Sequence, residues 1–181
     1  MLARLFQSIE HVSSGFKPLW RAYHELYREI VAQEIRLAAI ESEDHILQIG
    51  CGAVPFTALH LAQQAGARVT AIDYDARAVK RARAVVARMN LAERITVECT
   101  KGIAGLTPSH TGVLVALQVR DKTGLYHAWH ERSQPPQRIV FRQPQPAHAQ
   151  EYGLLHLALP PDGTVHYAMR TFRTSLLYRR R

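Results

Sequence analysis

The segment spanning residues 45–73 constrains the fold of this chain more than any other part of its sequence. It reads as an apolar run, a Gly-x-Gly turn, a helix-compatible stretch and a second apolar run that ends in an acid. These parts are residues 45–49, Gly50-Cys51-Gly52, residues 55–64, residues 68–72 and Asp73. Glycine lets the backbone approach a bound group closely, and the following helix offers unpaired N–H groups. Because a carboxylate at the tip of the second strand can accept hydrogen bonds from both ribose hydroxyls, the unit indicates a nucleoside ligand.

The residues missing from this turn narrow the choice of nucleoside. A dinucleotide-binding turn needs a third glycine, but Pro55 stands three residues after Gly52. A phosphate-binding loop would require Gly-Lys-Ser/Thr, which is also absent. The turn and its acid resemble motifs I and II of class I S-adenosylmethionine (SAM) enzymes. That resemblance implies that the turn holds the methionine part of SAM and that Asp73 holds the ribose.

Strands and helices alternate along the rest of the chain. We expect an α/β, Rossmann-like class I SAM methyltransferase fold, with N-terminal helices and a mostly parallel sheet that ends in an antiparallel strand. Helices are predicted at 16–41, 55–64, 76–89 and 122–131, and strands at 45–49, 68–73, 95–99, 113–119 and 138–142. Residues 153–159 read as helix or strand, and 164–172 and 174–179 as two closing strands around the turn 160–163. Residues 1–42 are predicted to be a helical cap over the cofactor pocket, and residues 43–181 a SAM-binding Rossmann-like domain, together one compact unit.

Composition indicates an ordinary globular protein. The chain has 181 residues, of which 47% are hydrophobic and 21% charged. It has no apolar run near the ~20 residues of a membrane span, and no secretory signal is visible over residues 1–10. Two cysteines, Cys51 and Cys99, favour a reducing cytoplasmic location over a disulfide framework. The net charge of +8 permits an RNA partner, but the arginines are scattered, so we expect a small-molecule substrate and no nucleic acid or membrane partner.

One carboxylate, that of Glu34, lies on the otherwise apolar face of the predicted N-terminal helix. Trp20, Tyr23, Tyr27, Ile30, Glu34 and Ala38 fall within an arc of about 80°. A carboxylate on an apolar face must be paired or neutralised. Glu34 therefore either faces the cofactor pocket, where it orients or deprotonates an amine, or pairs with an arginine at the rim.

Two motifs of base-modifying methyltransferases are absent. The Asn/Asp-Pro-Pro-Tyr/Phe motif expected after the fourth strand is replaced by residues 116–121, Ala-Leu-Gln-Val-Arg-Asp. The usual Gly-Asp after the third strand is replaced by residues 99–102, Cys-Thr-Lys-Gly. Both absences make a base-modifying enzyme a weaker hypothesis than a small-molecule enzyme.

A more specific resemblance lies in the glycine turn itself. Residues 49–58, Ile-Gly-Cys-Gly-Ala-Val-Pro-Phe-Thr-Ala, are similar to the Gly-x-Gly-x-x-Pro-x-Thr signature of nicotianamine synthase and related bacterial metallophore enzymes. Residues 113–117 are similar to that family's fourth strand. The helix from Tyr23 to Glu34 resembles its tyrosine-rich helix, which ends in a functional glutamate. The resemblance covers residues 16–181 and implies attack at the γ carbon of SAM's aminocarboxypropyl arm, with release of methylthioadenosine.

The same resemblance implies site residues. Glu34 would hold or deprotonate the amine, and Tyr23 and Tyr27 would line the arm and face the sulfonium by cation–π attraction. The implied SAM contacts are Gly50, Cys51, Gly52, Pro55, Thr57, Asp73, Tyr74 and Leu117. No metal is expected, because the histidines, including His127 and His130, have no convincing ligand spacing.

This chain departs from the family in one respect. Larger members carry a helical domain ahead of the SAM domain, whereas few residues precede the tyrosine-rich helix here, which predicts a reduced acceptor site. A small pocket favours cyclisation, in which the α-amino group of SAM attacks its own γ carbon to give azetidine-2-carboxylate. Azetidine-2-carboxylate synthases that resemble nicotianamine synthase are a precedent. Transfer to a small amine and ordinary methyl transfer to a small molecule, with RNA modification behind them, remain open.

Overall fold

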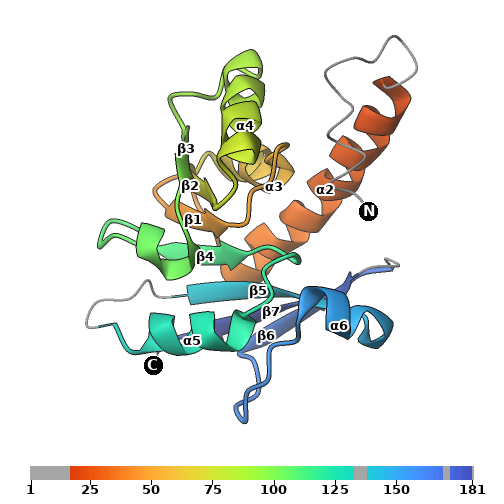
Figure 1. The fold of residues 1–181 in the computed structure, drawn as a ribbon, viewed down its shortest axis with the longest axis vertical. Coiled ribbons are helices and arrows are strands. Elements are labelled where there is room, and N and C mark those ends of the chain that lie inside the picture. The colour runs from red at the N-terminus through yellow and green to blue at the C-terminus, as the bar shows by residue number, and fades with distance from the viewer. Residues whose placement is uncertain (1–16, 133–137, 169–171, 181) are drawn as a thin grey trace.

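A seven-stranded sheet forms the centre of the protein, in the order β3-β2-β1-β4-β5-β7-β6 (Figure 1). The computed structural model describes residues 17–132, 138–168 and 172–180, so most of the N-terminal part of the predicted cap and the side chain of Trp20 lie outside the described part. The strands are β1 His45–Ile49, β2 Arg68–Asp73, β3 Ile95–Cys99, β4 Gly112–Val115, β5 Arg138–Pro144, β6 Gly163–His166 and β7 Phe172–Arg179. Strands β1 to β5 pair in parallel, and β7 is antiparallel to both β5 and β6. The predicted α/β fold, with a mostly parallel sheet and an antiparallel finish, is confirmed.

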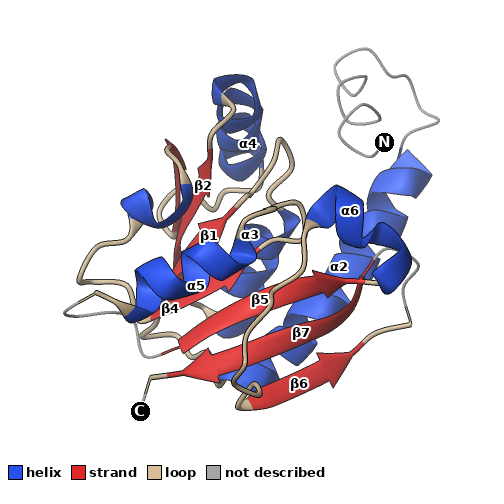
Figure 2. Cartoon of the chain, turned by 60° about the horizontal axis from the view of Figure 1, so that its bottom comes forward, coloured by secondary structure: helices blue, strands red, loops and turns tan. Residues whose placement is uncertain are grey.

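Helices cover both faces of this sheet. They are α2 Lys17–Ala38, α3 Phe56–His60 with the π-helical turn Leu61–Ala65, α4 Ala76–Arg88, α5 Lys122–His130 and α6 Ala149–Tyr152, with 3₁₀ turns at Gly102–Gly105 and Pro146–His148. In Figure 2, α5 and α6 lie in front of the sheet and α2 lies behind β5, β7 and β6. None of the described helices is long and apolar enough to cross a membrane.

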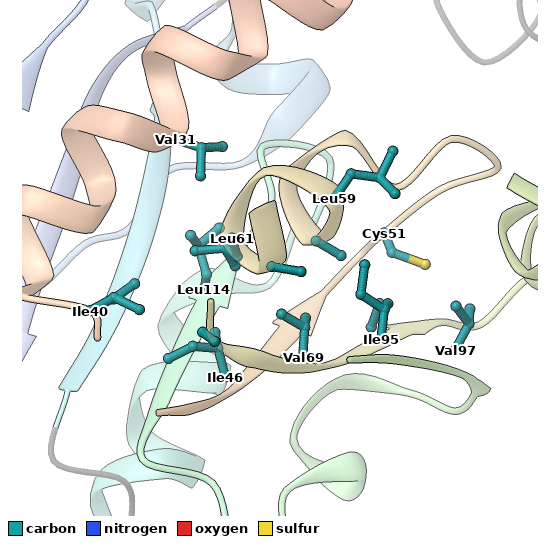
Figure 3. Close-up of a cluster of buried hydrophobic side chains, with 14 of the residues drawn as sticks. Val31, Ile40, Ile46, Cys51, Leu59, Leu61, Val69, Ile95, Val97 and Leu114 are labelled. Carbon is teal, nitrogen blue, oxygen red and sulfur yellow. The ribbon is translucent and has the colours of Figure 1, made fainter. Parts of the chain in front are cut away.

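The core has two layers because side chains alternate between the faces of each strand. On one face, Val31 of α2, Leu59 of α3 and Leu114 of β4 belong to one buried cluster (Figure 3). On the other face, Trp129 of α5 packs with Leu47 and Phe141 in a second cluster. Strands buried on both faces need near-continuous apolar sequence, which explains why β1, β2 and β5 were found at or near their predicted bounds.

Three predicted elements differ from the structure. Strand β4 ends at Val115, not at residue 119, because a turn closed by the Val119 N–H and the Ala116 carbonyl follows it. Residues 153–159 form neither helix nor strand, and the short helix α6 precedes them instead. The strand predicted over 164–172 is the four-residue β6, and residues 169–171 lie outside the described part.

Candidate active site

The glycine turn is bonded directly to the acid at the end of β2. The Gly52 N–H donates to Asp73 Oδ2 at 2.8 Å, and the N–H groups of Gly50 and Cys51 both donate to the Ile72 carbonyl. Gly50 and Gly52 have φ angles of +83° and +65°, in the left-handed region that favours glycine. The sequence therefore places a tight glycine turn against the carboxyl ends of β1 and β2.

Asp73, the last residue of β2, and Asp75, two residues later, accept different hydrogen bonds. Asp75 is the N-cap of α4, and its Oδ1 accepts from the Arg77 N–H at 2.8 Å. Asp73 instead accepts from Gly52 and, through Oδ1, from the Asp75 N–H at 3.0 Å. Each Asp73 oxygen has one such bond and retains acceptor capacity. Asp73 is thus the acid that is bonded directly to the glycine turn.

The space around the glycine turn is open at Gly52 and filled at Gly50. A Cβ built on Gly52 would meet no atom within 4 Å, whereas one on Gly50 would lie 2.9 Å from Val119 Cγ2. Tyr74 follows Asp73 and is 75% exposed. The turn therefore packs against the loop after β4 through Gly50 and faces open space at Gly52.

Glu34 lies inside the protein in a buried ion pair. It is 0% exposed, and Arg142 of β5 donates to its two oxygens at 2.8 and 2.7 Å. Ser175 of β7, which lies opposite Arg142 in the sheet, donates its hydroxyl to Glu34 Oε1 at 2.7 Å. The arginine partner was one of the two predicted alternatives, but the pair lies in the interior and not at a rim.

Aromatic rings connect this ion pair to the glycine turn. The Tyr27 ring stacks on Phe56, the first residue of α3, with centroids 5.3 Å apart. The Arg142 guanidinium lies 5.4 Å from the centre of the Tyr27 ring and 5.7 Å from that of Phe172. Tyr27 therefore lies between the start of α3 and the Glu34–Arg142 pair. Tyr23 is one helical turn earlier on α2 and is half-buried.

Burial and charge set the protonation of these groups. Burial alone would lower the pKa of Arg142, but the Glu34 carboxylate reverses this and raises it above its ordinary value. Burial raises the pKa of Tyr27, and it raises the pKa of Cys51 to about 12. The Cys51 thiol is therefore neutral and is not a nucleophile at physiological pH.

The remaining predicted contacts lie around the same edge of the sheet. Pro55 is the N-cap of α3, and the Thr57 side chain is buried within that helix. Leu117, just after β4, is buried in a cluster with Ile30 and Phe172. Their proposed roles toward a ligand remain predictions.

Three polar residues of this region were not found from the sequence. Arg142 and Ser175 complete the Glu34 network, and Lys122 lies fully buried at the start of α5. The only signal for Arg142 was a positive charge at the end of a predicted buried strand. Among the described residues, no group of three or more His, Cys, Asp or Glu side chains could hold a metal ion.

Several solved structures have a fold similar to that of this chain. No family model matches the sequence. Solved structures align over most of the chain: a glutamate-to-glutamine variant of MtNAS, a nicotianamine synthase, in complex with SAM has a TM-score of 0.77 at 19% identity, covering 99% of this chain and 72% of that chain. An RNA methyltransferase from Salinibacter ruber in complex with S-adenosyl-L-homocysteine has a TM-score of 0.68 at 19% identity, covering 83% of this chain and 90% of that chain. The fold is that of class I SAM methyltransferases.

A curated relative adds similarity in sequence. L-histidine 2-aminobutanoyltransferase of Yersinia pestis is 32% identical over 104 residues, which cover 57% of this chain and 38% of that relative. The match thus spans less than half of the relative's length. Together with the MtNAS structures, one of which is in complex with MTA and tNA, it confirms the resemblance to nicotianamine synthase-like enzymes indicated by the glycine turn.

Proposed function

We propose that this protein is a SAM-utilising enzyme that attacks the γ carbon of the aminocarboxypropyl arm and releases methylthioadenosine. The observation that carries the proposal is the cradle made by Gly52 and Asp73, with open space beside it. The resemblance of residues 49–58 to the nicotianamine synthase signature, and the similarity to an aminobutanoyltransferase, support γ-carbon chemistry over methyl transfer.

In the proposed complex, SAM lies across the carboxyl ends of β1 and β2. Asp73 would accept hydrogen bonds from the ribose, and the Gly50–Gly52 turn would hold the methionine part. Exposed Tyr74 stands beside Asp73, where an adenine ring can stack on it. Leu117 would close the β4 side of the pocket.

In the chemical step, an amine nitrogen forms a bond to the γ carbon while the γ-carbon–sulfur bond breaks. The bonding electrons leave with sulfur as the neutral thioether methylthioadenosine, and the amine loses a proton. Because the leaving group needs no protonation, the residues have two tasks: to align the amine and to keep it unprotonated.

We propose that the Glu34–Arg142 pair performs this alignment. The hydrogen bonds from Arg142 and Ser175 leave one of the roughly four acceptor positions of the Glu34 carboxylate, on Oε2, for a substrate amine. Arg142 fixes the carboxylate bidentately, so Glu34 cannot turn away from that position. Tyr27, which lies against Arg142, would line the arm together with Tyr23 and face the sulfonium.

Two amines could act as the nucleophile in this chemistry. The name of the Yersinia relative favours transfer to a small amine. Cyclisation of SAM to azetidine-2-carboxylate, with its own α-amino group as nucleophile, is the other form of the proposal, and it needs no acceptor site. Incubation of the protein with SAM alone separates the two, because only cyclisation proceeds without an added amine.

The alternative function is methyl transfer to a small molecule, which would release S-adenosylhomocysteine. It is favoured by the similarity in fold to methyltransferases, and RNA methylation is its less favoured form. The glycine turn would bind SAM in the same way in either case, so only the product distinguishes these functions.

Substitution at Gly52 tests whether SAM occupies the cradle. Gly52→Ala should weaken SAM binding by about tenfold or more, since its Cβ would enter the open space beside Asp73. Backbone strain at φ +65° should cost about 1 kcal/mol of stability. Isothermal titration with SAM and chemical denaturation measure the two effects.

Gly66→Ala is the matched control, because Gly66 has a φ of +71° at the end of the π-helical turn before β2, where no ligand role is proposed. It should share the loss of stability and leave SAM affinity unchanged. Equal SAM affinity in Gly52→Ala and the wild type would move the ligand away from this turn.

A further inference from the structure

Lys122 is buried among backbone carbonyls, and no acidic side chain in the described part of the protein pairs with it. Its side chain is 0% exposed, and its ammonium donates to the carbonyls of Leu117 at 3.0 Å, Val119 at 2.6 Å, Tyr152 at 2.7 Å and Gly153 at 3.0 Å. An ammonium has three N–H donors, so the four acceptors use all of its hydrogen-bonding capacity. A buried cation without a counter-ion is costly, and burial lowers the pKa of Lys122 to about 8. The four carbonyls are therefore the groups that accommodate the ammonium in the interior.

The carbonyls that Lys122 binds come from two separate segments. Leu117 and Val119 belong to the loop after β4, and Tyr152 and Gly153 belong to the end of α6 and the residue after it. The segments are in close contact, because a Cβ on Gly153 would lie 2.1 Å from the Arg120 carbonyl oxygen. Without the ammonium, four carbonyl dipoles would point at one another without a donor.

Both segments form part of the candidate site. The loop after β4 packs on the glycine turn, where a Cβ on Gly50 would meet Val119. Leu117 lies in the buried cluster with Ile30 and Phe172, against which Tyr152 and Tyr167 also pack. Three further hydrogen bonds hold the segment after α6. The His156 N–H donates to Thr123 Oγ1, the Leu155 N–H donates to Gln143 Oε1, and Gln143 Nε2 donates to the Leu155 carbonyl.

We propose that Lys122 is a positioning residue that acts as a tethered internal cation and fixes the β4-side wall of the SAM pocket. It joins the Leu117–Val119 loop to the Tyr152–Gly153 segment, and it acts on the ligand only through these carbonyl-bearing residues. The functional part of this inference rests on the proposed SAM site. The bridging of the two segments does not, and it can be measured without ligand.

Chemical rescue tests the role of the ammonium. Lys122→Ala removes the four atoms of a propylammonium, so n-propylammonium chloride can refill the cavity. We expect Lys122→Ala to weaken SAM binding by about tenfold or more, and propylammonium to restore most of that loss. Tetramethylammonium, which has the same charge but no N–H donor, should restore none. Equilibrium binding is measured instead of turnover, because an added amine can also act as an acceptor.

Two further variants keep the test decisive. Lys122→Met fills the volume without donors and should bind SAM as weakly as Lys122→Ala, while Lys80→Ala on the exposed side of α4 should match the wild type. Wild-type SAM affinity in folded Lys122→Met, or equal rescue by both cations, would overturn the proposal.

If the wild type itself does not bind SAM, the proposed function fails, and hydrogen exchange of the ligand-free protein then tests whether Lys122 bridges the two segments. Exchange over residues 116–120 and 152–156 should accelerate in Lys122→Ala and slow with propylammonium, and unchanged exchange would contradict the bridging role.

Discussion

At the scale of single residues, the Glu34–Arg142 pair shows how a charge is kept inside this protein. Glu34 has no exposed surface and receives hydrogen bonds from Arg142 and Ser175. The Tyr167 hydroxyl donates to Ser175 and extends the network. Removing one partner of a buried pair leaves the other charge unpaired, which typically costs about 3–5 kcal/mol. Any test of Glu34 in catalysis must therefore separate loss of chemistry from loss of stability.

Glu34→Gln is the variant that makes this separation. The amide keeps the shape of the side chain but removes the charge opposite Arg142, so the free energy of unfolding should fall by about 3 kcal/mol. SAM binding should be retained, and turnover should be suppressed because the neutral amide can neither take up the proton of the amine nor attract it as strongly as the carboxylate. Denaturation, SAM titration and a rate measurement are compared in one preparation.

Glu29→Gln is the control on the same helix, since Glu29 is exposed, lies 3.8 Å from Arg36 and accepts a hydrogen bond from Gln33. It should leave both stability and rate near the wild type. Full turnover in folded Glu34→Gln would place Glu34 among the structural residues.

The sequence located Glu34 but not its partner. Its place on the apolar face of α2 follows from helical periodicity, and the burial of Ile30 and Ala38 agrees with it. Arg142 lies 108 positions away, and nothing in a single sequence pairs two residues across that distance. The same holds for Lys122, whose acceptors are backbone carbonyls that carry no sequence signal.

At the scale of elements, the strand–turn–helix units were predictable and the irregular ones were not. Strands β1, β2 and β3 and helix α4 have apolar periodicity and clear ends, such as Asp75 before α4. The π-helical turn after α3, the 3₁₀ turns and α6 are short, and side-chain and tertiary contacts decide them. The segment after α6 is fixed by Lys122, Thr123 and Gln143 and not by its own propensity.

Asp73 and Asp75 give a paired prediction at this scale. Asp75→Ala removes the N-cap of α4 and should lower stability by about 1 kcal/mol without changing SAM affinity. Asp73→Ala should weaken SAM binding by about 1–3 kcal/mol, the range for a hydrogen bond to a charged group. Thermal denaturation and SAM titration of both variants check this. A larger loss of SAM affinity in Asp75→Ala than in Asp73→Ala would reverse the assignment of the two acids.

At the scale of the whole molecule, two buried histidines link stability to pH. Burial lowers the pKa of His60 and of His110 to about 4. His60 lies in α3, where its Nε2 is 3.0 Å from the His24 carbonyl of α2, and His110 lies before β4, where its Nδ1 accepts from the Thr107 N–H. Burial therefore keeps both rings neutral, His60 at the contact of α3 with α2 and His110 in the loop before β4.

The sign of the resulting pH dependence follows from proton binding. The unfolded chain takes up a proton at each histidine near its ordinary pKa of about 6.5, and the folded chain only near 4. Stability from these rings is therefore fully present above about pH 6.5 and is lost as the pH falls toward 4, by up to about 3 kcal/mol for each histidine. Denaturation curves at a series of pH values should show this loss.

His60→Gln and His110→Gln should each flatten the pH profile between about pH 6.5 and 4. His166→Gln, on the exposed side of β6, should leave the profile unchanged. A profile that keeps its full slope in the His60→Gln and His110→Gln double variant would assign acid sensitivity to other groups.

The most direct test of the proposed function is the identity of the nucleoside formed from SAM by the purified protein, read by mass spectrometry with and without a small amine. We expect methylthioadenosine, with the four-carbon arm recovered on the amine or as azetidine-2-carboxylate. S-adenosylhomocysteine as the product, with a methylated acceptor, would contradict it.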